Sequence, residues 1–182
     1  MDSRMESMRG TTVVGVRLNG TTALAADGQV TFGETVVKDT AKKILRIYND
    51  KVIVGFAGAV ADAQTLAERF EKKLEGFRGN LPRAAVELAR EWRTDKYLRR
   101  LESMLLAGDA EHLLLVSGSG EVIQPDGDVA AIGSGAGYAL AAARVLLKHT
   151  NFSAEKVVEE ALLTAAGICI YTNSNVFIEK IP

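Results

Sequence analysis

A two-residue turn, Asn19-Gly20, is the feature of the sequence that most constrains the fold. The apolar stretch 12–16 precedes this turn, and the apolar stretch 22–26 follows it. Asn-Gly between two strand-like segments is a strong β-hairpin signal, because both residues tolerate the positive φ angles of a type I′ turn. A doubly wound parallel sheet has no place for such a hairpin. The chain is therefore predicted to begin with antiparallel strands.

The rest of the chain alternates groups of strands with pairs of helices. A second predicted hairpin, 44–47 with 52–56, makes the first third an antiparallel meander. An amphipathic helix follows around Leu66 and Phe70, and another runs from Asn80 and Pro82 through about residue 106. Later strands are predicted at 112–117, 121–123, 129–132, 168–171 and 176–181, and later helices at 138–148 and after Ser153. This order predicts an α+β fold, a four-layer αββα sandwich with two antiparallel sheets face to face.

Composition indicates one globular domain. The chain has 182 residues, of which 47% are hydrophobic, and its 22 basic and 23 acidic residues give a net charge of −1. That balance provides no basic surface for nucleic acid or for a membrane. The single cysteine, Cys169, excludes an intrachain disulfide and agrees with a cytoplasmic location. Residues 1–10 are polar and form neither a secretory signal nor an anchor, so they are either a short pro-segment or a terminus without function.

The junction Gly10-Thr11-Thr12 lies where this leader meets the first strand. If the Gly10–Thr11 bond is cut, Thr11 carries a hydroxyl nucleophile and a free α-amine that can serve as its base. A threonine that opens a strand is ordinarily only a β-branched residue in a favourable place. The junction alone therefore leaves both interpretations open.

Asp27, Lys43 and Ser134 are the side chains that this chemistry would need. Taken singly, an Asp before Gly is usually a turn former, and a Lys at a strand edge, such as Lys42 or Lys43, is usually solvated. Taken together, the Lys43 ammonium would favour the deprotonated forms of the Thr11 amine and hydroxyl. Asp27 would hold that lysine and balance its charge, and Ser134 would hydrogen-bond the amine or a bridging water.

Two glycine-rich segments, 55–58 and 133–137, stand before predicted helices and resemble phosphate cradles. The first lacks the Lys-Ser/Thr pair of a P-loop, and the second lacks a βαβ context, so nucleotide binding is disfavoured. A backbone N–H at Gly55 could instead stabilise an oxyanion. Cys169 is interpreted as a small buried hydrophobe, and His112 and His149 show no metal-ligand spacing.

Several segments in one order resemble the HslV (ClpQ) family, the peptidase subunits of bacterial two-component ATP-dependent proteases, which are proteasome-like threonine peptidases. The resemblance runs from Thr11 to the C-terminus. It implies the N-terminal-nucleophile hydrolase fold of proteasome β-subunits, an αββα sandwich. The segments are Thr11-Thr12-Val13-Val14, Gly28-Gln29-Val30-Thr31-Phe32-Gly33, Lys51-Val52-Ile53-Val54-Gly55-Phe56-Ala57-Gly58, Ala84-Ala85-Val86-Glu87-Leu88-Ala89, Trp92-Arg93-Thr94-Asp95, Ala131-Ile132-Gly133-Ser134-Gly135 and Ile168-Cys169-Ile170-Tyr171-Thr172-Asn173.

The resemblance also implies roles for individual residues. Thr11 would be the nucleophile with its own amine as general base, beside the charged pair Asp27 and Lys43. Ser134 matches the serine near the amine, and Gly55 the oxyanion-hole position. A structural sodium ion would be bound by the backbone carbonyls of Ala166, Cys169 and Thr172, with Ala166 standing where some relatives have Gly.

Family membership further implies an assembly, two stacked rings of six subunits, and a separate hexameric ATPase, HslU (ClpY), that unfolds and delivers protein substrates. This chain itself would bind no nucleotide. Because the leader is longer than the lone Met of some relatives, internal cleavage after Gly10 is expected, or initiation at Met5 or Met8. We expect residues 1–10 to be removed and residues 11–182 to form a single peptidase domain. An N-terminal-threonine amidase on small molecules and a non-catalytic ring component remain as alternatives.

Overall fold

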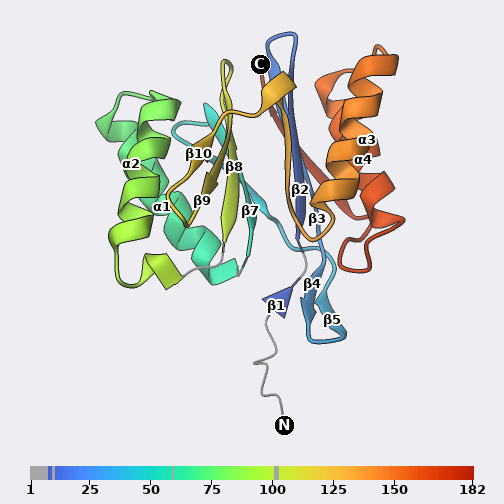
Figure 1. Cartoon of the computed structure of the whole chain (residues 1–182), viewed down its shortest axis with the longest axis horizontal. Helices are drawn as coiled ribbons and strands as arrows, with labels where there is room; N and C mark the ends of the chain where they lie inside the picture. The colour runs from blue at the N-terminus through green and yellow to red at the C-terminus, as the bar shows by residue number, and fades with distance from the viewer. Residues whose placement is uncertain (1–7, 10, 59, 101–102) are drawn as a thin grey trace.

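The computed structural model describes residues 8–9, 11–58, 60–100 and 103–182. Two antiparallel sheets stand face to face in the middle of the molecule, with a pair of helices outside each (Figure 1). One sheet has the strand order β11-β2-β3-β12, with β2 (Thr12–Leu18), β3 (Thr21–Asp27), β11 (Val129–Gly133) and β12 (Val176–Ile181). The other has the order β10-β9-β8-β7-β6, with β6 (Ile44–Ile47), β7 (Val52–Ala57), β8 (Met104–Gly108), β9 (Leu113–Ser117) and β10 (Val122–Ile123).

The helices divide between the two outer faces (Figure 1). Helices α1 (Val60–Gly76) and α2 (Leu81–Thr94) cover the sheet that contains β7, and α3 (Ala136–His149) and α4 (Ala154–Ala166) cover the sheet that contains β2. Asn80 caps α2 by accepting from Arg83 N, and Ser153 caps α4 by accepting from Lys156 N, as their positions before the helices predicted.

Buried apolar side chains form three layers that match this architecture. One layer joins α1 and α2 to their sheet around Phe70 and Trp92, and another joins α3 and α4 to theirs around Val158 and Leu162. The third lies between the two sheets and includes Val13. The predicted αββα sandwich is confirmed.

The Asn19-Gly20 hairpin is confirmed in its detailed geometry. Asn19 has φ 51° and Gly20 has φ 80°, and the turn joins β2 to β3 in antiparallel register. The hairpin of β6 and β7 also forms, but in the other sheet. The prediction of one continuous meander is therefore wrong, because consecutive hairpins are divided between the two layers.

Two further boundaries differ from the sequence prediction. The second helix ends at Thr94 rather than near residue 106, because Asp95 has an extended ψ of 132° and its carboxylate accepts from Tyr97 N and Leu98 N. A 3₁₀ turn, η1 (Leu98–Arg100), and then β8 follow, so Leu105 is a strand residue, while Leu101 lies outside the described residues.

The strand predicted at 168–171 is also wrong. Cys169 N donates to Ala165 O at 2.8 Å, and Thr172 N donates to Cys169 O at 3.1 Å. These N–H groups bond to carbonyls three or four residues back, so the segment is a series of turns rather than a strand.

A small sheet that the sequence did not predict lies at the end of the sandwich nearest the N-terminus (Figure 1). Its order is β1-β4-β5, with β1 (Met8–Arg9), β4 (Val30–Phe32) and β5 (Thr35–Lys38). β1 pairs antiparallel with β4, with Arg9 opposite Thr31. The end of the leader is thus held as a strand beside the Gly10-Thr11 junction.

A short 3₁₀ turn, η2 (Asp126–Asp128), leads into β11.

No helix in the described part of the chain is long and apolar enough to cross a membrane.

Candidate active site at one end of the sandwich

The predicted catalytic residues come together where four strands begin or end. Thr11 directly precedes β2, Asp27 is the last residue of β3, Lys43 precedes β6, and Ser134 follows β11. In the sheet that contains β2 and β3, Val13 lies opposite Ala26, so the start of β2 is next to the end of β3. Thr11, Asp27 and Lys43 are all buried. The topology thus places residues far apart in sequence at one end of the molecule.

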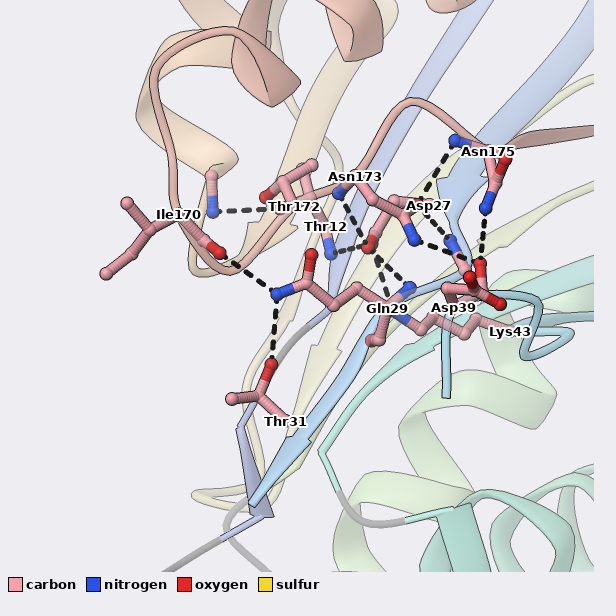
Figure 2. Close-up of polar contacts among 12 residues, drawn as sticks. Thr12, Asp27, Gln29, Thr31, Asp39, Lys43, Ile170, Thr172, Asn173 and Asn175 are labelled. Atoms are coloured by element: carbon pink, nitrogen blue, oxygen red, sulfur yellow. Dashed lines mark hydrogen bonds and ion pairs between the residues drawn. The ribbon is translucent and has the colours of Figure 1, made fainter. Parts of the chain in front are cut away.

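Asp27 is the centre of this site (Figure 2). Its side chain is fully buried, and its Oδ1 accepts from Thr12 N at 2.8 Å and from Lys43 Nζ at 2.9 Å. Its Oδ2 accepts from Gln29 N at 2.9 Å and from Asn173 N at 3.4 Å. A buried carboxylate needs such partners, because an unpaired one would be costly to desolvate. Asp27 is therefore a buried anion held in one orientation, not a turn residue in solvent.

Lys43 is the cation of the pair. Its Nζ also donates to Gln29 O at 2.6 Å, and the residue is only 7% exposed. Burial lowers the pKa of Lys43 from its usual 10.5, while the charge and hydrogen bond of Asp27 oppose that shift. Because Lys43 Nζ and Thr12 N share one oxygen of Asp27, the lysine is held close to the peptide group that follows Thr11. Lys43 is thus a buried cation, not a solvated edge residue.

The glycine segment 133–135 contacts the two threonines through its backbone. Ser134 N donates to Thr11 O at 2.9 Å, and Gly135 N donates to Thr12 Oγ1 at 2.9 Å. Gly133 has φ 96°, and a Cβ there would lie 1.8 Å from Thr11 O. A Cβ at Gly135 would lie 2.6 Å from Thr12 Oγ1. These glycines therefore allow close approach to Thr11 and Thr12, and Ser134 meets Thr11 through its main chain.

Gly55 occupies a different environment from the one predicted. It lies inside β7, with Ile44 of β6 and Leu106 of β8 as its register partners. Phe56 N donates to Lys43 O on the β6 side, so the preceding N–H, that of Gly55, faces β8. A Cβ at Gly55 would lie 2.6 Å from Val13 Cγ1, which explains the glycine by sheet-to-sheet packing. This geometry argues against Gly55 as the oxyanion donor.

Sequence reasoning missed the polar side chains that surround the predicted ones. Thr12 is fully buried, and its Oγ1 lies 2.7 Å from Thr172 Oγ1. The side chain of Gln29 donates to Thr31 Oγ1 and to Ile170 O. Threonine at a buried strand start was a visible signal for Thr12, whereas the contact of Gln29 with Ile170 depends on turns that were predicted as a strand.

Ala166, Cys169 and Thr172, the predicted sodium ligands, lie at the C-terminal end of α4 and in the turns after it. Ala166 is the last residue of α4, where carbonyl oxygens lack partners within the helix and carry partial negative charge. Cys169 O lies in the turns and already accepts from Thr172 N. Hard cations prefer oxygen ligands such as these carbonyls. This donor chemistry fits a sodium ion. Among the described residues, no group of three or more His, Cys, Asp or Glu side chains could hold a metal ion. Cys169 is a buried free thiol, as predicted.

Comparison with known proteins agrees with the fold. Residues 7–181 match the family model described as "Proteasome subunit". The chain therefore belongs to the proteasome-subunit family.

Two relatives specify its place in that family. The chain is 57% identical over 174 residues to the ATP-dependent protease subunit HslV of Chlorobium luteolum, and the match covers 96% of each protein. The crystal structure of eukaryotic HslV from Trypanosoma brucei is 45% identical, with a TM-score of 0.89 over 93% of this chain and 98% of that one. The chain is thus an HslV-type subunit of an ATP-dependent protease.

A more distant structure, Thiobacillus denitrificans BPH in complex with epoxomicin, shares the fold. It is 23% identical, with a TM-score of 0.75 over 93% of this chain and 97% of that one.

Proposed function

We propose that this protein is a threonine endopeptidase that hydrolyses unfolded polypeptide through an acyl-enzyme on Thr11. The observation that carries the proposal is the buried Lys43–Asp27 ion pair. The Asp27 oxygen that accepts from Lys43 Nζ also accepts from Thr12 N, the N–H of the peptide bond that follows Thr11. Cleavage of the Gly10–Thr11 bond would give Thr11 a free α-amine beside its hydroxyl. A nucleophile, its base and a buried cation would then occupy the same end of the sandwich.

The reaction would proceed in two steps. Thr11 Oγ1 attacks the substrate carbonyl carbon, and the α-amine takes the hydroxyl proton. When the tetrahedral intermediate collapses, the carbon–nitrogen bond breaks, and the leaving amine takes that proton. Water then attacks the resulting ester with the amine again as base, and the acid product leaves with Thr11 restored. Lys43, as an ammonium, would lower the pKa of the amine and the hydroxyl, and Asp27 would hold it in place.

The oxyanion would be stabilised by an N–H at the end of β7. The resemblance indicates Gly55, but the interior position of Gly55 favours Gly58, the first residue after the strand. Gly58 has φ 141°, and Ser103 leaves no space for a Cβ there. Gly58 is thus outside the β7 ladder. Because β6 and β7 are antiparallel, Gly58 lies at the end of β7 that is next to the start of β6, where Lys43 lies.

Substrate polypeptide would bind as an added strand on β4. The leader already shows this geometry, because β1 pairs antiparallel with β4 immediately before the Gly10-Thr11 junction (Figure 1). Main-chain hydrogen bonds to a sheet edge accept an extended, unfolded segment and exclude a folded one. This supports unfolded protein over a small amide as the substrate class.

The carbonyls of Ala166, Cys169 and Thr172 would bind a sodium ion with a structural role. Bound there, the ion would neutralise the partial negative charge at the end of α4. The Thr172 side chain extends from the same turn to Thr12, so this ion would help to fix the turn beside the site.

The partner would be a hexameric ATPase of the HslU (ClpY) type, which unfolds and delivers substrates. The printed name of the Chlorobium luteolum relative, ATP-dependent protease subunit, supports this pairing. Two stacked rings of six subunits in the cytoplasm would confine a peptidase that reads little of its substrate's sequence. ATP would be hydrolysed by the partner and not by this chain.

The experiment compares wild type with Thr11→Ala and Thr11→Ser by intact mass and by hydrolysis of a fluorogenic peptide. We expect wild type to begin at Thr11, Thr11→Ala to keep its leader and lose activity, and Thr11→Ser, which keeps a hydroxyl, to retain part of it. Hydrolysis by Thr11→Ala at the wild-type rate would refute the mechanism. Rapid turnover of small amides without any response to the ATPase would favour the amidase. Assembled rings with no hydrolysis by any form would favour a scaffold.

A further inference from the structure

Asn173 contacts two other segments at the edge of the site and one residue of its own loop (Figure 2). Its Oδ1 accepts from Gly28 N at 3.1 Å, in the turn after β3, and from Asn175 N at 3.1 Å within its own loop. Its Nδ2 donates to Asp39 O at 2.9 Å, before β6. Its backbone N–H donates to Asp27 Oδ2. One residue therefore links the loop after α4 to the segments that carry Asp27 and Lys43.

The segment 39–43 carries Lys43 into the site, and its main chain is held by hydrogen bonds although Asp39, Thr40 and Lys42 are exposed. Asp39 O accepts a second side-chain hydrogen bond, from Asn175 Nδ2 at 2.8 Å. A Cβ at Gly28 would lie 2.2 Å from Asp39 O, and Ala41 N donates to Gly28 O at 2.9 Å. The segment is thus held against Gly28 at two points before it reaches Lys43.

We propose that Asn173 is a positioning residue that fixes Lys43 relative to Asp27 by joining the two segments that carry them. The inference rests on the proposed peptidase function and adds a residue to which no role has been assigned. Asn173 does not act on the reacting atoms. It acts through Gly28 and Asp39, whose backbones set the separation between the Lys43 ammonium and the Asp27 carboxylate.

The test uses Asn173→Ala and Asn173→Asp in the full chain, with and without the cognate ATPase. Asn173→Ala removes both side-chain links, and we expect kcat to fall about tenfold with KM little changed. Asn173→Asp keeps the size and the Oδ1 acceptor, but it loses the donor to Asp39 O and adds a negative charge. That charge favours protonated Lys43, so the alkaline limb of the kcat profile should shift upward, on the order of one pH unit.

Asn175→Ala is the matched control, because it removes the other donor to Asp39 O but leaves Gly28 and Asp27 in contact with Asn173. We expect a smaller loss of kcat and no shift of the pH profile. Thermal unfolding of each variant separates positioning from folding. If Asn173→Ala does not fold, Asn173→Asp carries the test through its pH profile.

The outcomes distinguish this inference from the proposed function. Folded, processed Asn173→Ala and Asn173→Asp with wild-type kcat and pH profile would overturn the positioning role while the peptidase stood. Losses accompanied only by lower thermal stability, with the pH profile of the active fraction unchanged, would also overturn it. A wild type that neither removes its leader nor cleaves peptide would refute the proposed function itself.

Discussion

Lys43 and Lys156 make similar ion pairs in opposite surroundings. Lys43 Nζ lies 2.9 Å from Asp27 Oδ1 at the buried end of the sandwich, and Lys156 Nζ lies 2.9 Å from Glu159 and 2.7 Å from Glu160 on the surface of α4. Their pKa values nevertheless move in opposite directions. Burial lowers that of Lys43, whereas hydrogen bonds to two carboxylates raise that of Lys156 to about 12. The acidity of a lysine thus depends on desolvation as much as on its partner.

This difference separates a lysine suited to catalysis from one suited to a surface. A buried cation keeps its electrostatic effect on nearby groups, because water does not screen it. An exposed pair is screened and contributes little. The two lysines therefore serve as matched test sites within one chain.

The largest expected effect comes from Lys43→Ala compared with Lys156→Ala. Loss of Lys43 should reduce peptide hydrolysis about 10²–10⁴-fold, because the reacting groups lose the charge that lowers their pKa. It should also lower the free energy of unfolding by about 3–5 kcal/mol, since it leaves Asp27 buried without its cation. Initial rates and denaturant unfolding measure both effects. Lys156→Ala should match the wild-type rate and lose only a small part of the stability, because its ion pairs are exposed and screened. Equal losses in the two variants would contradict the comparison.

A smaller effect is expected from Asp27→Asn compared with Glu160→Gln. The amide keeps the shape of Asp27 but loses its charge. Its NH₂ group, a donor, would then face a backbone N–H group that donates a hydrogen bond to the carboxylate in the wild type. We expect an activity loss of about 10²-fold and lower stability. The same two assays apply. Glu160→Gln, on the exposed pair, should change neither, and an Asp27→Asn enzyme with the wild-type rate would remove Asp27 from the mechanism.

The smallest effect is the pH dependence of stability. Native Lys43 loses its proton below 10.5, so the unfolded chain binds more protons there, and its contribution to the free energy of unfolding rises with pH up to 10.5. Native Lys156 keeps its proton to about 12, so its contribution is present below 10.5 and is lost as pH rises through about 12.

Urea unfolding of wild type and each Lys→Ala variant across alkaline pH measures these contributions. The stability difference from wild type should grow with pH for Lys43→Ala and shrink for Lys156→Ala. Slopes of the same sign for both variants would show that burial does not set the acidity of Lys43.

Much of the fold could be predicted from local signals. The Asn19-Gly20 turn, the apolar face of α1 and the caps at Asn80 and Ser153 depend on neighbouring residues, and each formed as predicted. The end of α2 was missed because the apolar period continues beyond it. The side chain of Asp95, which accepts from Tyr97 N and Leu98 N, competes with the helix at that point.

The site was predictable in part. Asp27 and Lys43 were identified, and the structure brings them together. The oxyanion role of Gly55 stays a prediction, and the close approach of Val13 gives a packing reason for a glycine at that position. Asn173 could not be assigned these contacts from sequence, since its partners outside its own loop lie 134 to 146 residues away. Contacts of that range exist only after both sheets have formed.

The strand pairing of the leader has a consequence for selectivity. If the leader is removed as proposed, β4 would present an unpaired row of main-chain groups, and such an edge can pair with an extended chain. Main-chain hydrogen bonds of this kind give affinity without depending on which side chains the substrate carries. An open edge of this kind would therefore make the enzyme general, and control over which chains reach it would then supply the discrimination.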